Sequence, residues 1–401
     1  MHAFDADILI SGGGVAGLTA AAAFGAAGFS VICVDPTPPV TDVRSKGADL
    51  RTTAFLQKSI PVLQAAGLWS RLEPHAAALN VMRIVDAGGA EAEPRVTRDF
   101  VADEISDLPF GWNLPNWLLR REMVARLEQL DTVTFLPGIA TQSVFTRSNS
   151  ARIGLSDGRR LRVRMLIAAD GRNSPMREAV GIGVHTIRYG QKALSFAVTH
   201  PHPHENVSTE VHRTGGPFTL VPLPDHQGQP CSAVVWMATG PEIASLSALS
   251  DDAFAAAVNA RSAGVYGRLT PIAGRGVWPI IAQYAERLNG QRTALVAEAA
   301  HVVPPIGAQG LNMSLADIGT LLELAQTHRQ DIGNDAMLDA YNAARHGDIR
   351  MRVQGIDALN RASMTGAPML RDMRALALTG MTALPAMRHQ LMRAGLGAGR
   401  S

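Results

Sequence analysis

The chain has 401 residues and a formal net charge of +2, and 46% of its residues are hydrophobic. This length is enough for two hydrophobic cores and an appended segment of an ordinary globular protein. The near-neutral charge does not indicate a nucleic-acid partner. The two cysteines, Cys33 and Cys231, are too far apart for a Cys-x-x-Cys site, which favours a reducing, cytoplasmic setting over a disulfide-rich secreted protein.

The first predicted unit is a strand, a glycine-rich turn and a helix. Residues 4–10 have the apolar character of a buried strand, and residues 18–27 have the small side chains of a tightly packed helix. The turn between them matches the spacing G-x-G-x-x-G and contains Gly12, Gly14, Val15, Ala16 and Gly17. Such glycines let a pyrophosphate approach the backbone, and the helix N-terminus offers it unpaired N–H groups. The pattern predicts a nucleotide-binding unit.

A second predicted strand, residues 29–34, ends at Asp35. A carboxylate at this spacing binds a ribose 2′-hydroxyl, so Asp35 favours FAD or NAD over a nucleotide with a 2′-phosphate. Residues 8–34 contain no charge, and a membrane helix is the alternative for this stretch. The glycines within it and the absence of a preceding basic segment disfavour both a membrane helix and a signal peptide.

The second motif follows a predicted strand at residues 161–169. It contains Asp170, Gly171, Ser174, Pro175 and Arg177. Serine before proline is typical of a helix start with the serine as N-cap, so the motif is predicted at a strand-to-helix turn. Asp-Gly is also common in simple turns, and the nearby Asp157-Gly158 is predicted to be only the turn of a hairpin.

The region before the third motif predicts an antiparallel sheet. Its strand-like segments, residues 194–199, 217–223 and 232–237, are separated by turn residues, and residues 79–86 are expected to join them. His200, His202 and His204 alternate with prolines, which predicts an exposed loop rather than a metal-binding strand. No metal site is therefore expected.

The third motif lies between a short predicted strand, residues 294–297, and a predicted helix, residues 311–324. Between them stand Glu298-Ala299-Ala300-His301 and Pro304-Pro305-Ile306-Gly307-Ala308-Gln309-Gly310. A glycine-rich loop again precedes a helix, whose N–H groups would stabilise negative charge on a reduced ring system. His301 and His212 are placed where a chemical role is conceivable, although histidines in packed segments are more often structural.

Residues 341–401 contain nine arginines, no lysine and three acidic residues. Methionine and leucine between the arginines predict amphipathic helices, interrupted near Pro368 and Pro385. A solvated basic face on a packed helix is one interpretation. The other is docking to an anionic membrane surface or to partner proteins. The chain is expected to be cytoplasmic, with peripheral association with the inner membrane left open.

Together the three motifs resemble the FAD-dependent aromatic-ring monooxygenases of the p-hydroxybenzoate hydroxylase-like group. Members carry G-x-G-x-x-G first, D-G-x-x-S-x-x-R in the middle and G-D-A-A-H-x-x-P-P-x-x-G-Q-G-x-N later, and the likeness spans nearly the whole chain. One departure is Ala297-Glu298, where the group usually has Gly-Asp. The carboxylate is kept on a side chain one methylene longer, so FAD binding is still expected.

The resemblance implies a tightly bound FAD and a set of contacts to it. The ADP half would contact Gly12, Gly14, Val15, Ala16, Gly17 and Asp35. The pyrophosphate and ribityl region would contact Arg51, Arg120, Asp170 and Glu298, and Asp170 is also implicated in handling NAD(P)H. The isoalloxazine ring would contact Pro305, Gly307, Gln309, Gly310, Leu311 and Asn312.

The implied chemistry is oxygen transfer from a flavin C4a-hydroperoxide to an electron-rich ring, after reduction of the flavin by NAD(P)H. No second nucleotide-binding motif is visible, so NAD(P)H is expected to bind transiently. The chemistry requires a cavity that excludes water more than it requires an acid–base pair, and no catalytic base is assigned.

Further segments resemble the ubiquinone-biosynthesis hydroxylases within this group. They are residues 49–54, 210–212, 215–224 and 357–361. The implied reaction is hydroxylation of a prenylated aromatic ring with O₂. Two alternatives stay open: a hydroxylase of a soluble aromatic compound, and a flavin-binding accessory subunit of a quinone-biosynthesis complex.

The patterns predict an α/β fold, with a Rossmann-type FAD-binding domain, an inserted, mainly antiparallel β substrate domain and C-terminal helices. The FAD-binding domain is expected to comprise residues 1–73, 114–180 and 285–340. The substrate domain is expected at residues 74–113 and 181–284, and the helical C-terminal region at residues 341–401.

Overall fold

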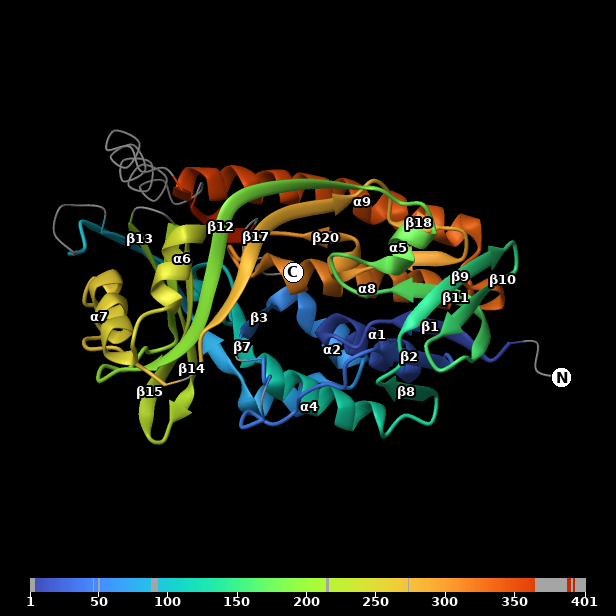
Figure 1. Cartoon of the computed structure of the whole chain (residues 1–401), viewed down its shortest axis with the longest axis horizontal. Helices are drawn as coiled ribbons and strands as arrows, with labels where there is room; N and C mark the ends of the chain where they lie inside the picture. Colours follow the sequence, from blue (N-terminus) through green and yellow to red (C-terminus); the bar gives the residue numbers. More distant parts are fainter. Residues whose placement is uncertain are drawn as a thin grey trace.

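The computed structural model describes residues 4–45, 47–49, 51–87, 93–213, 216–272, 274–364, 388–390 and 392–393. The fold is α/β, as predicted, and contains three β-sheets. Figure 1 shows the first sheet at one end of the molecule and the second at the other, joined by two long strands.

The first sheet is a mainly parallel sheet of the Rossmann type, with strand order β18-β19-β11-β1-β2-β8. Its strands are β1 (Ala6–Ser11), β2 (Val31–Asp35), β8 (Val133–Pro137), β11 (Arg160–Ala168), β18 (Asn289–Gly290) and β19 (Thr293–Leu295), and β10 (Ser150–Leu155) and β9 (Thr141–Arg147) extend it from β11. Its covering helices include α1 (Val15–Ala26), α4 (Asn116–Leu127) and α8 (Gln309–Thr327), of which α1 contacts the other two. The apolar residues of β1 and α1 are buried in the largest hydrophobic cluster.

The predicted elements around the motifs are present, with shifted ends that have physical causes. Helix α1 begins at Val15 rather than at residue 18, because Gly14 takes the extended conformation of an N-cap. Strand β19 ends at Leu295 rather than at residue 297, because Ala297 has a φ of +57° and belongs to a 3₁₀ turn, Ala297–Ala299. Helix α8 begins at Gln309, two residues earlier than predicted.

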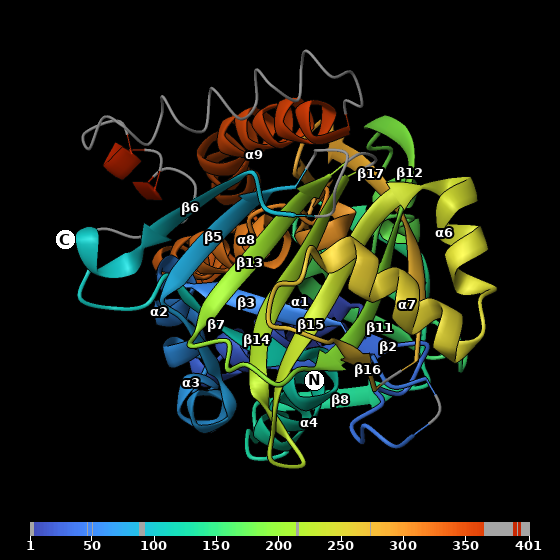
Figure 2. The ribbon, with the colours of Figure 1, turned by 90° about the vertical axis from the view of Figure 1, so that its left-hand side faces the viewer.

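The second sheet has strand order β20-β17-β12-β15-β14-β13-β5-β6. Its strands are β5 (Val81–Asp86), β6 (Val96–Val101), β12 (Val184–Thr199), β13 (Val207–Arg213), β14 (Gly216–His226), β15 (Gln229–Thr239), β17 (Gly276–Ala285) and β20 (His301–Val302), and β16 (Thr270–Pro271) pairs with β12. Figure 2 shows α6 (Gly240–Ser247) and α7 (Asp251–Ser262) lying over one face of this sheet. The opposite face of the second sheet lines a cavity.

The second sheet is antiparallel except at β5, which joins it as predicted but pairs with β13 in parallel. The long strands β12 and β17 extend beyond it toward the first sheet, and their pairing shifts register between Arg188 and Lys192. A third sheet, of order β3-β7-β4, contains β3 (Thr52–Leu56), β4 (Ala77–Leu79) and β7 (Gly111–Pro115). The predicted domain boundaries stay predictions.

The remaining described helices are short, except for one. The short helices are α2 (Ile60–Ala65), α3 (Trp69–Leu72) and α5 (Pro175–Ala179). Helix α9 (Asp335–Met364) is long, contacts α8 and β17, and follows β12 along the edge of the molecule in Figure 1. The helix breaks predicted near Pro368 and Pro385 lie outside the described residues. Among the described helices, none combines the length and the apolar character needed to cross a bilayer.

Candidate functional site

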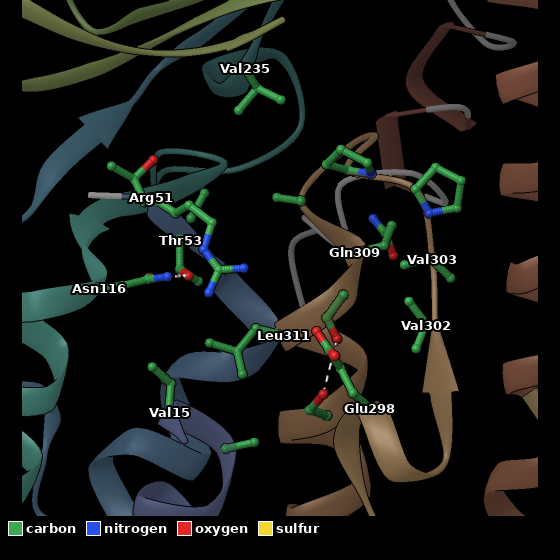
Figure 3. A pocket seen from close by; sticks show the side chains of 18 of the residues that line it. Val15, Arg51, Thr53, Asn116, Val235, Glu298, Val302, Val303, Gln309 and Leu311 are labelled. Atoms are coloured by element: carbon green, nitrogen blue, oxygen red, sulfur yellow. Dashed lines mark hydrogen bonds between the residues drawn. The ribbon is translucent and has the colours of Figure 1, made fainter. Parts of the chain in front are cut away.

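A cavity of about 510 Å³ lies between the three motifs and the face of the second sheet that α6 and α7 do not cover. In Figure 3, Arg51, Thr53 and Asn116 line one side of it, and Glu298, Val302 and Gln309 line the opposite side. Val15 of α1 and Val235 of β15 mark two further walls. Segments far apart in the sequence therefore meet around one space.

The glycine-rich turn forms the wall at the N-terminus of α1. A Cβ atom at Gly12 would collide with the carbonyl group of Ala169, and one at Gly17 would collide with the carbonyl of Gly12, so both glycines are needed for packing. Gly14 has open space around it, and no side chain caps α1. The free N–H groups of the first turn of α1 are therefore available to an anionic ligand.

Asp35 holds the glycine-rich turn in place. Its Oδ2 accepts a hydrogen bond from the N–H of Gly13 at 2.6 Å, and its Oδ1 accepts one from the N–H of Thr37 at 2.7 Å. Each carboxylate oxygen keeps a second lone pair, so a ribose hydroxyl could still donate to it. Asp35 stands beside the cavity and outside its lining.

Two arginines share one carboxylate at the cavity wall. Asp49 accepts hydrogen bonds from Arg51 Nη2 at 2.7 Å, Asn116 Nδ2 at 3.1 Å and Arg120 Nη2 at 3.4 Å. Arg51 also lies over the ring of Trp278, 5.4 Å from its centroid. Two positive charges against one negative charge leave a net positive group, which is suited to a pyrophosphate. The sequence predicted both arginines as cofactor contacts, but it did not predict that Asp49 joins them.

The second motif caps the helix that follows it, α5. Asp170 accepts hydrogen bonds from the Ser174 hydroxyl and from the N–H of Met176, and Ser174 Oγ in turn accepts the N–H of Arg177, as predicted for an N-cap. Burial raises the pKa of the Asp170 carboxyl more than these hydrogen bonds and Arg177 lower it. Its predicted contact with the cofactor stays a prediction, because Ala169, Gly171 and Arg172 line the cavity while Asp170 does not.

Glu298 is presented to the cavity by the 3₁₀ turn of the third motif. Its side chain is about half exposed and lies 3.7 Å from Arg172 Nε. The side chain lines the cavity, and its predicted contact with the ribityl chain stays a prediction. Ala308 and Gly307, with φ values of +54° and +62°, turn the following loop so that the N-terminus of α8 faces the cavity.

Asn312 locks the third motif to the third sheet. Its Oδ1 accepts hydrogen bonds from the N–H of Leu56 and the hydroxyl of Ser59, and its Nδ2 donates to the carbonyls of Ala54 and Ala308. The donor and acceptor groups of the Asn312 side chain are therefore all satisfied within the protein. Asn312 positions the loop from behind the residues that line the cavity. Its predicted contact with the flavin ring stays a prediction.

His301 belongs to a buried polar network that the sequence did not reveal. Its Nε2 lies 2.7 Å from Asp317 Oδ2, and Asp317 Oδ1 accepts a hydrogen bond from Arg345 Nε at 2.9 Å. The network joins the cavity wall to α8 and α9. The predicted exposure of the histidine-proline loop holds for His202 but is wrong for His200, which is buried because its ring stacks on Tyr266 and bonds to Ser232. Among the described residues there is no cluster suited to a metal ion.

The cavity collects most of the predicted cofactor-binding residues. Those in its lining are Gly14, Val15, Ala16, Gly17, Arg51, Arg120, Glu298, Pro305, Gly307, Gln309, Gly310 and Leu311. Gly12, Asp35, Asp170 and Asn312 lie behind them. The uncapped N-terminus of one helix and a cationic pair both suit a pyrophosphate, and the N-terminus of a second helix along the same cavity suits a flavin ring.

Comparison with known proteins agrees with this arrangement. A family model described as an FAD binding domain matches residues 5–354. The chain belongs to this FAD-binding family. The ubiquinone hydroxylase UbiL of Rhodospirillum rubrum is 30% identical over 98% of the chain and 90% of the relative. This likeness confirms the prediction of an FAD-dependent flavoprotein monooxygenase.

Other relatives are similar over comparable lengths. The 3-demethoxyubiquinol 3-hydroxylase of Escherichia coli K12 is 25% identical over 98% of both chains. Human mitochondrial ubiquinone biosynthesis monooxygenase COQ6 is 26% identical over 96% of the chain and 91% of the relative. Among solved structures, p-nitrophenol 4-monooxygenase PnpA of Pseudomonas putida superposes with a TM-score of 0.78 at 16% identity, covering 98% of the chain and 99% of that protein. The likeness to this solved structure supports the fold described above for the chain.

Proposed function

We propose that this monooxygenase hydroxylates a prenylated aromatic ring in ubiquinone biosynthesis, with NAD(P)H as the transient reductant. The observation that carries the proposal is the cavity, whose lining joins the FAD-binding motifs to the second sheet and includes an apolar end formed by Leu79, Met82 and Phe110, which lie outside those motifs. FAD, when bound, supplies electrons from NAD(P)H and activates O₂, with transfer through a flavin hydroperoxide as the expected route. The protein residues would bind the ring and exclude water.

The apolar end of the cavity supports a hydrophobic tail on the ring. Phe110 and Met82 also belong to a cluster with Phe100 of β6 and Met392. Apolar side chains therefore continue from the cavity lining toward the C-terminal residues. A long alkenyl chain gains about 25 cal/mol for each Å² that it buries, whereas a small soluble ring would leave this end unfilled.

Helix α9 supports peripheral contact with a membrane, where such a substrate resides. Met351 and Leu359 are 64% and 60% exposed, and two helical turns separate them on the same face. The flanking Arg350 and Arg361 are exposed beside them. Apolar side chains bordered by arginines are suited to the interface of an anionic bilayer.

The test of the proposed function is mass spectrometry of lipid extracts from a strain that lacks this gene, with the gene restored on a plasmid as control. We expect loss of the quinone and accumulation of a prenylated precursor that lacks one hydroxyl group. An unchanged quinone pool, in a strain without a redundant hydroxylase, would favour a soluble aromatic substrate. A missing quinone combined with a purified protein that oxidises no NAD(P)H in the presence of the precursor would favour an accessory subunit.

A further inference from the structure

The sheet face of the cavity carries one carboxylate whose role the flavin site does not explain. Three carboxylates line the cavity: Asp49, Glu298 and Glu210. Asp49 is paired with Arg51 and Arg120, and Glu298 lies near Arg172, so both belong to the motif side. Glu210 belongs to β13 of the second sheet, on the opposite wall.

Strand register aims Glu210 into the cavity. Its neighbours on β13, Thr209 and Val211, are buried and point to the opposite face of the sheet, where Val211 joins the cluster under α6 and α7. Thr219 stands directly across from Glu210 on β14 and lines the same cavity. The Glu210 side chain is only 17% exposed, so its carboxylate is largely removed from bulk water.

His212 holds one oxygen of this carboxylate. Its Nε2 lies 2.7 Å from Glu210 Oε1, and the two residues share a face of β13 because they are two positions apart. Burial alone would raise the pKa of Glu210, but attraction to His212 and the hydrogen bond to it lower the pKa below its ordinary value. Within the described part of the chain, no group donates a hydrogen bond to Oε2. An ionised oxygen on a mostly buried side chain at a cavity wall is unfavourable unless a hydrogen-bond donor pairs with it.

The apolar residue Met82 lies on the strand that pairs with β13, on the cavity side. Ser208, two residues before Glu210 on β13, pairs with Met82 of β5, and both line the cavity. The spacing along a strand, combined with the spacing between strands, places Met82 about 8 Å from the Glu210 position. An aromatic ring with a hydroxyl group and an alkenyl chain on neighbouring carbons would therefore present its donor to Glu210 and its chain to Met82 and Phe110.

We propose that Glu210 is the specificity-determining residue that accepts a hydrogen bond from a ring hydroxyl of the substrate, with His212 as its positioning residue. The inference rests on the proposed function and deepens it, because it requires a ring with a free hydroxyl group at the contact. An O-methyl ether has no proton to donate and would leave Oε2 of the carboxylate without a donor. The hydrogen bond also draws the hydroxyl proton toward Glu210, which enriches the ring in electrons where oxygen is transferred.

The test compares two probes on the FAD-loaded full-length protein: 2-allylphenol and its O-methyl ether, 2-allylanisole. Their dissociation constants are measured from the change in flavin absorbance. A hydrogen bond to a charged group corresponds to about 10- to 100-fold in affinity, so we expect the wild type to prefer the phenol by that factor. Glu210→Gln should reduce the preference several-fold, and Glu210→Leu should abolish it.

The ratio of two ligands on one variant cancels a general loss of affinity, and Glu210→Gln keeps the side-chain volume if the leucine variant folds poorly. Glu242→Gln, on the exposed N-terminal turn of α6, is the matched control and should keep the wild-type ratio. Equal binding of the two probes by the wild type, binding of neither, or an undiminished preference in both Glu210 variants would each overturn the inference. An unchanged quinone pool in the deletion strain, with hydroxyl preference retained, would instead count against the proposed function.

Discussion

Arg177 Nη1 donates a hydrogen bond to the carbonyl oxygen of Ala299 at 3.1 Å, and this bond joins the second motif to the third. The same nitrogen donates to the carbonyl of Arg172 at 3.0 Å. The guanidinium is almost fully buried. The arginine of the second motif therefore sets the position of Glu298, next to Ala299 in the chain, without lining the cavity itself.

Replacement of Arg177 by methionine should separate the two motifs. Both carbonyls would lose a charged donor, and hydrogen bonds to charged groups contribute about 1.5–3 kcal/mol each. We expect the free energy of unfolding to fall by at least about 2 kcal/mol and the purified protein to retain less FAD, measured by urea unfolding and flavin absorbance. Arg159→Met, in the exposed hairpin turn, is the control. Full FAD content and wild-type stability in Arg177→Met would contradict the role.

Ala297 is the position where the family usually has glycine, and its backbone explains the preference. A φ of +57° costs a residue with a Cβ about 1–2 kcal/mol, while glycine loses about 0.4–1 kcal/mol through the entropy of the unfolded chain. Ala297→Gly should therefore raise the free energy of unfolding by about 0.5–1 kcal/mol, measured from the urea midpoint. Ala300→Gly, three residues on with a φ of −92°, should lower it. Equal destabilisation by both substitutions would refute the strain argument.

The Asp49–Arg51 pair predicts a pH dependence that an exposed pair of the same spacing should lack. Burial tends to raise the pKa of Asp49, but Arg51, Asn116 and Arg120 lower that pKa below the ordinary value of an aspartate. A lowered pKa stabilises the fold above the ordinary value, and this stabilisation is lost as the pH falls through the folded-state pKa. Asp49→Asn should cost about 2 kcal/mol, constant from about pH 7 to 5 and shrinking below about pH 4.

The matched control for this series is Asp42→Asn. Asp42 also accepts hydrogen bonds from the backbone and guanidinium of an arginine two residues later, Arg44, but the pair is exposed to solvent. Water screens such a pair, so its loss should leave the urea midpoint unchanged. A constant gap between wild type and Asp49→Asn down to pH 3 would contradict the assignment of the lowered pKa.

The sequence predicted those parts of the site that are encoded locally. Gly12, Gly14 and Gly17 act within one turn, and Ser174 caps the helix that follows it, so spacing alone was sufficient. Asn312 was predicted to contact the flavin ring, and this contact stays a prediction. The structure adds that Asn312 is held behind the cavity lining by hydrogen bonds to Leu56, Ser59 and Ala54, and by a fourth to Ala308. No local pattern predicts the three of these bonds that span more than two hundred residues.

The substrate wall was the least predictable part. Glu210 and His212 stand two residues apart, so a strand places them on one face, but the sequence does not say which face meets the cavity. The answer depends on β5, which arrives from more than a hundred residues earlier and pairs with β13 in parallel. The same limit applies to Asp49, whose partner Arg120 lies on a different element.

Exposed apolar residues of α9 predict binding to anionic vesicles. Met351→Glu combined with Leu359→Glu replaces two exposed apolar groups by charges that anionic lipid repels. We expect flotation with phosphatidylglycerol-containing vesicles at low salt for the wild type and at least a several-fold loss for the double variant. Val43→Glu with Leu108→Glu makes the same charge change at exposed residues elsewhere. Equal flotation of both double variants would remove α9 from the interface.

We expect Met392 to determine how the enzyme distinguishes substrates whose alkenyl tails differ in length. It is 2% exposed and packs in the cluster that contains Phe110, whose side chain also lines the cavity. Arg388 pairs with Glu104 beside it, which fixes the segment to the turn after β6. Met392→Glu would place a charge in the apolar cluster that contains Phe110, against which we expect a long alkenyl chain to pack. A buried charge is unfavourable next to apolar groups, so KM for a long-tailed phenol in detergent should rise about tenfold, while KM for 2-allylphenol should stay unchanged.

Leu108→Glu, at an exposed site, should alter neither constant. An equal rise for both substrates would mean that Met392 supports the fold of the ring pocket rather than the path of the tail.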